Sequence, residues 1–293
     1  MKIMARKTST GIRKPMSPEA RAKIADAVKK SAQKKRIEAG LPPEQAMPTG
    51  PARHKELDIV QMRDQKFDKD LFVPMATGRE IDFLFSLEGG INKATNYLVV
   101  GDPGVGKSTV TLDIVADLVN LGYRCLFISA EMTRIDLYGY VKRFPKFGEV
   151  DILFIGEYCD SNPKTVIEQV LLPGYDVVLI DSFAEVQEDI KEALKLSSSG
   201  SEKWLIDLMV SHNLGNNTMR KNTTFIAIQQ VTKGGVFVGS NKLKHNTTGM
   251  LELRMDQESG SSYMVFAKNR RGSVGKRMFY SLSASGDVEY DLK

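Results

Sequence analysis

The residues with the clearest chemical meaning lie between positions 97 and 109, where the chain reads YLVVGDPGVGKST. An apolar run leads directly into the spacing G-x-x-x-x-G-K-S, which is typical of a loop that holds phosphate groups. Glycine permits the tight backbone curvature that turns several N–H groups toward one anion. The pattern therefore predicts a nucleotide site made of the consecutive residues Gly101, Asp102, Pro103, Gly104, Val105, Gly106, Lys107, Ser108 and Thr109.

Two side chains in this loop have separate expected roles. Lys107 supplies a positive charge for the phosphates, and the Ser108 hydroxyl is an expected magnesium ligand. The flanking segments support this interpretation, because residues 97–100 are typical of a strand and residues 109–119 carry apolar side chains at helical spacing.

Two acidic residues follow other apolar runs. Asp181 ends the run over 177–180, and it is expected to hold Mg²⁺ opposite Ser108. Glu131 follows the run over 125–129, where a carboxylate can polarise the water that attacks a phosphate. The alternative for Glu131 is an acid at the start of a helix, where the helix dipole favours negative charge.

The elements that must position these residues alternate between strand-like and helix-like segments from residue 77 onward. This alternation predicts an α/β fold with a mostly parallel central sheet flanked by helices. Because the carboxyl ends of parallel strands share one edge, Glu131, Asp181 and the phosphate loop are expected at the same edge. The expected strands cover residues 97–100, 125–129, 152–155, 177–180, 224–229, 251–255 and 262–269.

Charge divides the chain unevenly. The whole chain carries +5, whereas residues 1–40 hold twelve Lys and Arg against three acids, which leaves −4 for residues 41–293. We expect a basic arm with one helix over 1–40, a proline-rich linker and lead-in over 41–76, and the main domain over 77–293. The arm is either a solvated helix or a segment that contacts nucleic-acid phosphates.

Composition excludes several classes of protein. The sequence has no run of eighteen apolar residues and no apolar stretch behind its basic start, so neither a membrane span nor a secretory signal is expected. Two cysteines, Cys125 and Cys159, do not form the C-x-x-C spacing of a zinc site. We therefore expect a cytoplasmic protein, or one in the host cytoplasm if it is viral.

Taken in order, the motifs resemble those of the RecA-type ATPases, in particular the RadA (Sms) branch-migration proteins and the DnaB replicative helicases. The resemblance covers residues 77–293. After the phosphate loop, SAEM over 129–132 is similar to the DnaB segment that carries the catalytic glutamate, and DS over 181–182 is similar to the family's magnesium strand. A later RadA motif resembles QQVTKGG over 229–235. A motif near the end of the domain, found in both RadA and DnaB, resembles AKNRRGSVG over 267–275.

The resemblance implies ATP and Mg²⁺ as cofactors and further site residues. Gln229 would be the γ-phosphate sensor, and Lys268 and Arg270 would reach the nucleotide of a neighbouring subunit. A site completed in this way implies a homo-oligomer, either a hexameric ring or a helical filament. The chain departs from RadA at Gln230, where RadA has histidine, and at Arg271, where RadA has an aromatic residue.

The leading functional prediction is an ATP-driven motor that acts on single-stranded DNA in replication, recombination or repair. Its expected protein partners are other replication or recombination proteins. A core domain of this kind would suit a bacteriophage. A strand-exchange recombinase and a non-motor loader or adaptor are the alternatives. Residues 231–249 form the preferred DNA-binding loop, through Lys233, Lys242 and Lys244. The asparagine-rich segment 213–222 is a second polar loop that could serve the same purpose.

Overall fold

The computed structural model describes residues 59, 61–66, 68–158, 160–230, 241–283 and 286–292. Contacts within the chain divide it into two units, Met1–Gln65 and Lys66–Lys293. In the first unit, the described residues contain the short 3-10 helix η1 (Met62–Asp64). The basic helix predicted over residues 1–40 lies outside the described residues, as do positions 41–58 of the predicted linker.

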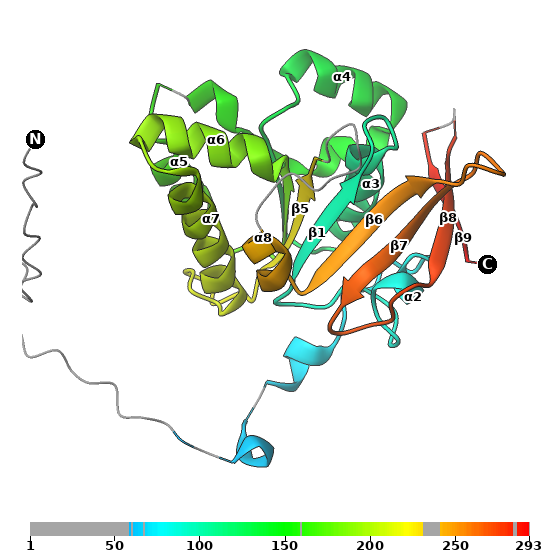
Figure 1. Ribbon diagram of the computed structural model, residues 1–293, viewed down its shortest axis with the longest axis horizontal. Coiled ribbons are helices and arrows are strands. Elements are labelled where there is room, and N and C mark those ends of the chain that lie inside the picture. Colours follow the sequence, from blue (N-terminus) through cyan, green and yellow to red (C-terminus); the bar gives the residue numbers. More distant parts are fainter. Residues whose placement is uncertain are drawn as a thin grey trace, which may run out of the picture. The chain divides into compact units, whose positions relative to one another are not determined.

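The second unit is built on a nine-stranded sheet in the order β3-β2-β4-β5-β1-β6-β7-β8-β9 (Figure 1). Strands β3 to β6 in this order pair in parallel, and β6 to β9 pair antiparallel. The predicted α/β fold with a mostly parallel sheet is therefore confirmed. The strands are β1 (Asn96–Gly101), β2 (Cys125–Ser129), β3 (Asp151–Phe154), β4 (Val177–Asp181), β5 (Thr224–Gln229), β6 (Gly249–Met255), β7 (Ser262–Asn269), β8 (Arg277–Leu282) and β9 (Val288–Leu292).

Side chains from the two faces of the sheet enter two separate hydrophobic clusters. Along β1, Tyr97 and Val99 belong to the cluster that includes helix α3 (Lys107–Asn120), whereas Leu98 belongs to the cluster that includes α6 and α7. Helices therefore cover both faces, which explains why β1, β2 and β4 are apolar almost throughout. The remaining helices are η2 (Lys69–Phe72), α2 (Asp82–Phe85), α4 (Arg134–Arg143), η3 (Pro145–Glu149), η4 (Ile155–Tyr158), α5 (Pro163–Leu171), α6 (Phe183–Leu194), α7 (Ser198–Asn213) and α8 (Asn241–Asn246).

Strands β8 and β9 were not predicted, although their sequences carry the expected signal. In β8 the alternate residues Met278 and Tyr280 are buried, while Arg277 and Ser281 are exposed. This alternation is typical of an antiparallel strand with one face on the core. Among the described residues, no helix combines the length and the apolar composition that crossing a bilayer requires.

The asparagine-rich segment 213–222 is held by its own amide groups. Asn213 donates to the side chain of Asn96 and to the Thr223 carbonyl, and Asn217 donates to the Lys221 carbonyl at 2.8 Å. The Asn222 amide donates to the Asn213 carbonyl at 2.8 Å. These side chains therefore stabilise the turn between α7 and β5.

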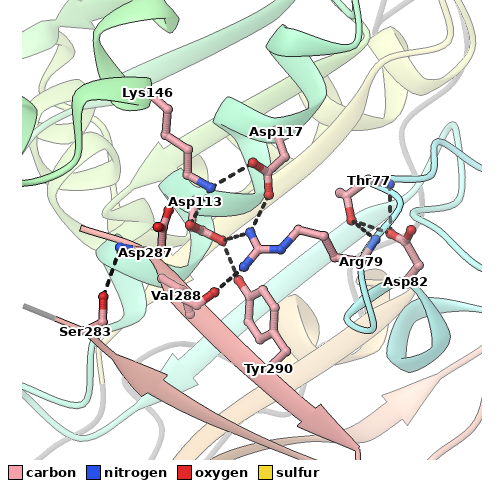
Figure 2. Close-up of polar contacts among 10 residues, drawn as sticks. All are labelled: Thr77, Arg79, Asp82, Asp113, Asp117, Lys146, Ser283, Asp287, Val288 and Tyr290. Atoms are coloured by element: carbon pink, nitrogen blue, oxygen red, sulfur yellow. Dashed lines mark hydrogen bonds and ion pairs between the residues drawn. The ribbon is translucent and has the colours of Figure 1, made fainter. Parts of the chain in front are cut away.

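A cluster of charged residues joins helix α3 to segments distant in sequence (Figure 2). Asp113 and Asp117, one turn apart on α3, lie between Arg79 and Lys146, and each carboxylate pairs with both cations at 2.5–2.7 Å. The Tyr290 hydroxyl from β9 donates to Asp113 at 2.8 Å. The helix that begins at the phosphate loop is thus tied to Arg79 at the start of the main domain, to η3 and to β9.

Candidate functional site

The phosphate loop runs from the end of β1 at Gly101 to the start of α3 at Lys107. Gly104 and Gly106 have φ values of +81° and +93°, in the left-handed region that glycine tolerates without strain. Gly106 is also the N-cap of α3, so this turn joins the loop to the helix. The local fold is therefore the strand, loop and helix that the sequence predicted, with the helix N-terminus available to an anion.

Lys107 lies over its own loop. Its Nζ donates to the carbonyl oxygens of Gly101 and Asp102 at 2.9 and 3.0 Å. Burial lowers the pKa of the Lys107 ammonium, and the nearby carboxylates of Asp181, Glu131 and Asp102 oppose this shift. The two carbonyl contacts keep the ammonium group at the loop, where a phosphate would meet it.

Ser108 and Asp181 lie side by side, as expected for two residues at one edge of a parallel sheet. The Ser108 hydroxyl donates to Asp181 Oδ2 at 2.5 Å, and Asp181 is 4% exposed at the end of β4. Burial raises the pKa of Asp181 to about 6; the charge of Glu131 adds to this shift, whereas the Ser108 hydrogen bond opposes it.

These two oxygens fit the protein side of a magnesium site. Mg²⁺ in nucleotide sites is usually held by one or two protein ligands, with water and substrate phosphates completing an octahedron. A serine hydroxyl beside a buried carboxylate supplies such a pair. Among the described residues, no group of three or more His, Cys, Asp or Glu forms a metal cage of its own.

Glu131 follows β2 at the same edge and is held by a neighbour that the sequence analysis did not assign. The Gln230 side chain donates to Glu131 Oε1 at 2.8 Å. Gln230 is exposed, whereas Gln229 is 1% exposed at the end of β5. Successive side chains of a strand point to opposite faces. The structure thus brings Gln230 into contact with Glu131, and the sensor role expected of its buried neighbour Gln229 stays a prediction.

One cavity of about 540 Å³ collects most of these groups, and its size is typical of a small-molecule site. Five described lining residues were not predicted as site residues: Tyr140 and Arg143 from α4, Ile228 and Gln230 from the end of β5, and Leu282 from β8. A second hollow of about 340 Å³ shares Thr109, Tyr140 and Arg143 with it. The full lining comprises Gly101, Pro103, Gly104, Gly106, Lys107, Ser108, Thr109, Glu131, Tyr140, Arg143, Asp181, Ile228, Gln230 and Leu282.

Lys268 and Arg270 lie near the amino-terminal ends of the parallel strands, away from the cavity. Because β7 runs antiparallel to β6, Asn269 pairs with Gly249, which pairs with Tyr97 near the start of β1. From there to the end of β1 at Gly101 is about 13 Å, at about 3.3 Å per residue. The structure therefore does not bring these two residues to the cavity of their own chain.

Both cations instead contact the carboxyl end of α8. Lys268 Nζ donates to the carbonyl oxygens of Lys244, His245 and Thr247 at 2.6, 3.1 and 2.5 Å. Arg270 donates to the His245 carbonyl at 3.0 Å. Cations stabilise the carboxyl end of a helix, where carbonyl groups lack helical partners.

Of the three predicted DNA-binding lysines, only Lys244 can be described. It lies half-buried on α8. Lys233 and the side chain of Lys242 lie outside the described residues.

Comparisons with known proteins show which family profile, sequence relatives and fold this chain resembles. Residues 75–149 match the profile of a family described as ATPase: KaiC. The crystal structure of the KaiC-like protein PH0186 from Pyrococcus horikoshii has a similar fold, with a TM-score of 0.54 at 17% identity, covering 74% of this chain and 98% of that one.

Curated relatives are proteins named DNA repair protein RadA. The Listeria monocytogenes protein is 28% identical over 204 residues, which are 69% of this chain and 42% of the relative. The Aquifex aeolicus protein is 26% identical over 201 residues, 69% and 43% of the two chains. This chain thus spans less than half the length of the curated relatives that it matches.

Proposed function

Since this chain carries a KaiC-like, RecA-type P-loop ATPase domain, we propose that it binds ATP in the cavity beside Lys107 and hydrolyses it. The observation that carries the proposal is the convergence of Lys107, Ser108, Asp181 and Glu131 on one cavity. We assign this activity to residues 77–293.

Each group has a role that its position supports. On binding, the Lys107 ammonium exchanges its contacts with the Gly101 and Asp102 carbonyls for phosphate oxygens. Ser108 and Asp181 would hold Mg²⁺, which neutralises charge on the phosphates. Glu131 orients and polarises the attacking water, and Gln230 holds the Glu131 carboxylate in place.

The outer part of the cavity suits the rest of the nucleotide. Tyr140 and Arg143 line both hollows beside the phosphate loop, and they offer an aromatic ring and a planar guanidinium group. Such planar groups pack against nucleobases. The ribose and base are therefore assigned to the hollow beneath α4.

We further propose that the site is completed by a second copy of the chain. Lys268 and Arg270 lie at the edge of the sheet away from their own cavity, so in a head-to-tail assembly they face the cavity of the next copy. Guanidinium is suited to this role because it stays charged and clamps phosphate oxygens bidentately. A repeated head-to-tail contact gives a ring or a filament.

The substrate of the motor is proposed to be single-stranded DNA. Support comes from the names of the curated relatives, which are DNA repair proteins, and from the basic residues Lys233, Lys242 and Lys244. A strand-exchange recombinase and a non-motor loader remain the alternative functions. Electron microscopy with an ATP analogue and single-stranded DNA separates them, because a closed ring favours the motor and an open helix favours the recombinase.

Mixing two inactive variants tests the shared site. Arg270→Ala should lower ATP turnover roughly 10³-fold while leaving ATP binding intact. Glu131→Gln should also stop turnover, because its own cavity lacks the base. A mixture should regain part of the wild-type rate, since some interfaces then combine an intact Glu131 with an intact Arg270.

A matched control uses Arg277, which is 53% exposed and faces Asp256. Arg277→Ala should keep wild-type turnover. If the mixture stays as inactive as its components although both variants assemble, completion by a second copy is wrong.

A further inference from the structure

Strand β8 contacts the phosphate loop at two positions. The Tyr280 hydroxyl donates to the Val105 carbonyl at 2.6 Å, and the two residues are 6% and 7% exposed. Two positions further along β8, Leu282 lies against Gly106, because a Cβ atom added there would be 3.0 Å from Leu282 Cδ1. The last hairpin of the chain therefore contacts two consecutive residues of the loop.

The hydrogen bond to Val105 has a consequence for the next amide group. The Val105 carbonyl and the Gly106 N–H belong to one planar peptide unit. In a trans peptide these two groups point in opposite directions, and this peptide bond is not among the cis bonds of the described residues. Because Tyr280 holds the carbonyl on its own side, the Gly106 N–H is turned away from Tyr280.

Gly106 lines the nucleotide cavity, and loops of this kind bind phosphates through main-chain N–H groups. We propose that Tyr280 is a positioning residue for nucleotide binding, whose hydroxyl fixes the orientation of the Gly106 N–H toward the phosphates. This inference rests on the proposed ATP site. It adds the carboxyl-terminal hairpin β8–β9 to that site and identifies the phosphates as the part of the ligand that is affected.

The surroundings of Tyr280 suit this role. Burial raises the pKa of the Tyr280 hydroxyl to about 12, so the group remains a donor throughout the neutral range. A donor fixed in a buried position orients its acceptor more firmly than a water molecule, which exchanges.

Tyr290, on the neighbouring strand β9, supplies a matched control. Its hydroxyl also donates to a group of the α3 segment, the Asp113 carboxylate, at 2.8 Å (Figure 2). Asp113 lies two turns along α3 from Gly106, and Tyr290 does not belong to the described cavity lining. Replacing either tyrosine by phenylalanine removes one hydroxyl and keeps the ring.

The test measures the Kd of ATP, ADP and adenosine by calorimetry on the full chain. Tyr280→Phe should raise the Kd of ATP and ADP about fivefold to tenfold, the equivalent of one neutral hydrogen bond. The Kd of adenosine, which lacks phosphates, should stay unchanged. Tyr290→Phe should lower the unfolding midpoint and leave all three constants unchanged.

Equal ATP affinities of Tyr280→Phe and wild type would overturn the inference, and so would an equal loss in both tyrosine variants. Wild-type protein that binds no ATP would instead overturn the proposed function, and the inference with it.

Two further measurements test the same contact, one on folded Tyr280→Phe and one for the case in which that variant does not fold. Hydrogen exchange of residues 101–107 without ligand should be faster in folded Tyr280→Phe than in wild type, whereas exchange of residues 110–120 should be unchanged. If Tyr280→Phe does not fold, Leu282→Ala removes the packing against Gly106 and should raise the Kd of ATP by a similar factor. An unchanged Kd in that variant would overturn the inference.

Discussion

Lys107 is the residue on which nucleotide binding depends most directly. Its ammonium group is partly desolvated and rests on two backbone carbonyls, with three carboxylates nearby. A bound phosphate would give the Lys107 ammonium a negatively charged hydrogen-bond acceptor in place of these neutral carbonyls. Next to Lys107, the Ser108 hydroxyl donates to Asp181, so the two expected magnesium ligands lie side by side.

Lys107→Ala should therefore weaken ATP binding at least about 100-fold, because the variant has no ammonium group to form charge-assisted hydrogen bonds with phosphate. Calorimetry with Mg·ATP measures the change. Lys142→Ala, which removes an exposed lysine of α4 that does not line the described cavity, is the control and should bind ATP normally. Tight ATP binding by Lys107→Ala would contradict the assignment of the site.

At the scale of elements, helix α3 is held by the charged cluster around Asp113 and Asp117 (Figure 2). Asp113 is fully buried, and it pairs with Arg79, at the start of the main domain, and with Lys146 of η3. Arg79 also packs over the Tyr290 ring at 4.6 Å. Since η3 directly follows α4, the cluster links α3 to the segment after the helix that carries Tyr140 and Arg143.

Asp113→Asn should lower the free energy of unfolding by about 3 kcal/mol, because removing one partner leaves buried cations without their full compensation. Chemical denaturation measures this value. Asp207→Asn is the matched control, since Asp207 pairs with Lys203 at a site where both side chains are about 60% exposed. That change should cost less than about 1 kcal/mol. Equal losses in the two variants would show that the buried cluster contributes no more than a surface pair.

At the scale of the whole molecule, the groups of the proposed site lie at the two opposite ends of the parallel strands of one sheet. The cavity lies at the carboxyl edge of the parallel strands, and Lys268 and Arg270 lie at the other. A single copy therefore carries two incomplete halves of the proposed site, which a head-to-tail assembly would combine. The basic arm of residues 1–40 adds a net charge of +9 to a chain whose remainder is acidic, and contact with nucleic-acid phosphates is one of the two roles expected of it.

Deleting residues 1–40 should flatten the salt dependence of binding to single-stranded DNA, by about 0.7 in logarithmic slope for each phosphate that the arm neutralises. Fluorescence anisotropy over a salt series measures the slope. A variant with the arm sequence shuffled should keep the wild-type slope, because the contribution depends on charge alone. If the deletion leaves the slope unchanged, the arm does not bind DNA.

The sequence by itself determined the phosphate loop, the strands β1 to β7 and the parallel sheet, because these depend on local backbone preferences and on hydrophobic periodicity. It also determined that Ser108 and Asp181 meet, since parallel strands align their carboxyl ends. Only the tertiary structure decided that Gln230 contacts Glu131 and that Tyr140, Arg143 and Leu282 enclose the cavity. Such contacts join residues far apart in the sequence through the order of the strands; Val105 and Tyr280, for example, are 175 positions apart. No periodicity within a short segment encodes such a contact, because it depends on how the whole sheet packs around α3.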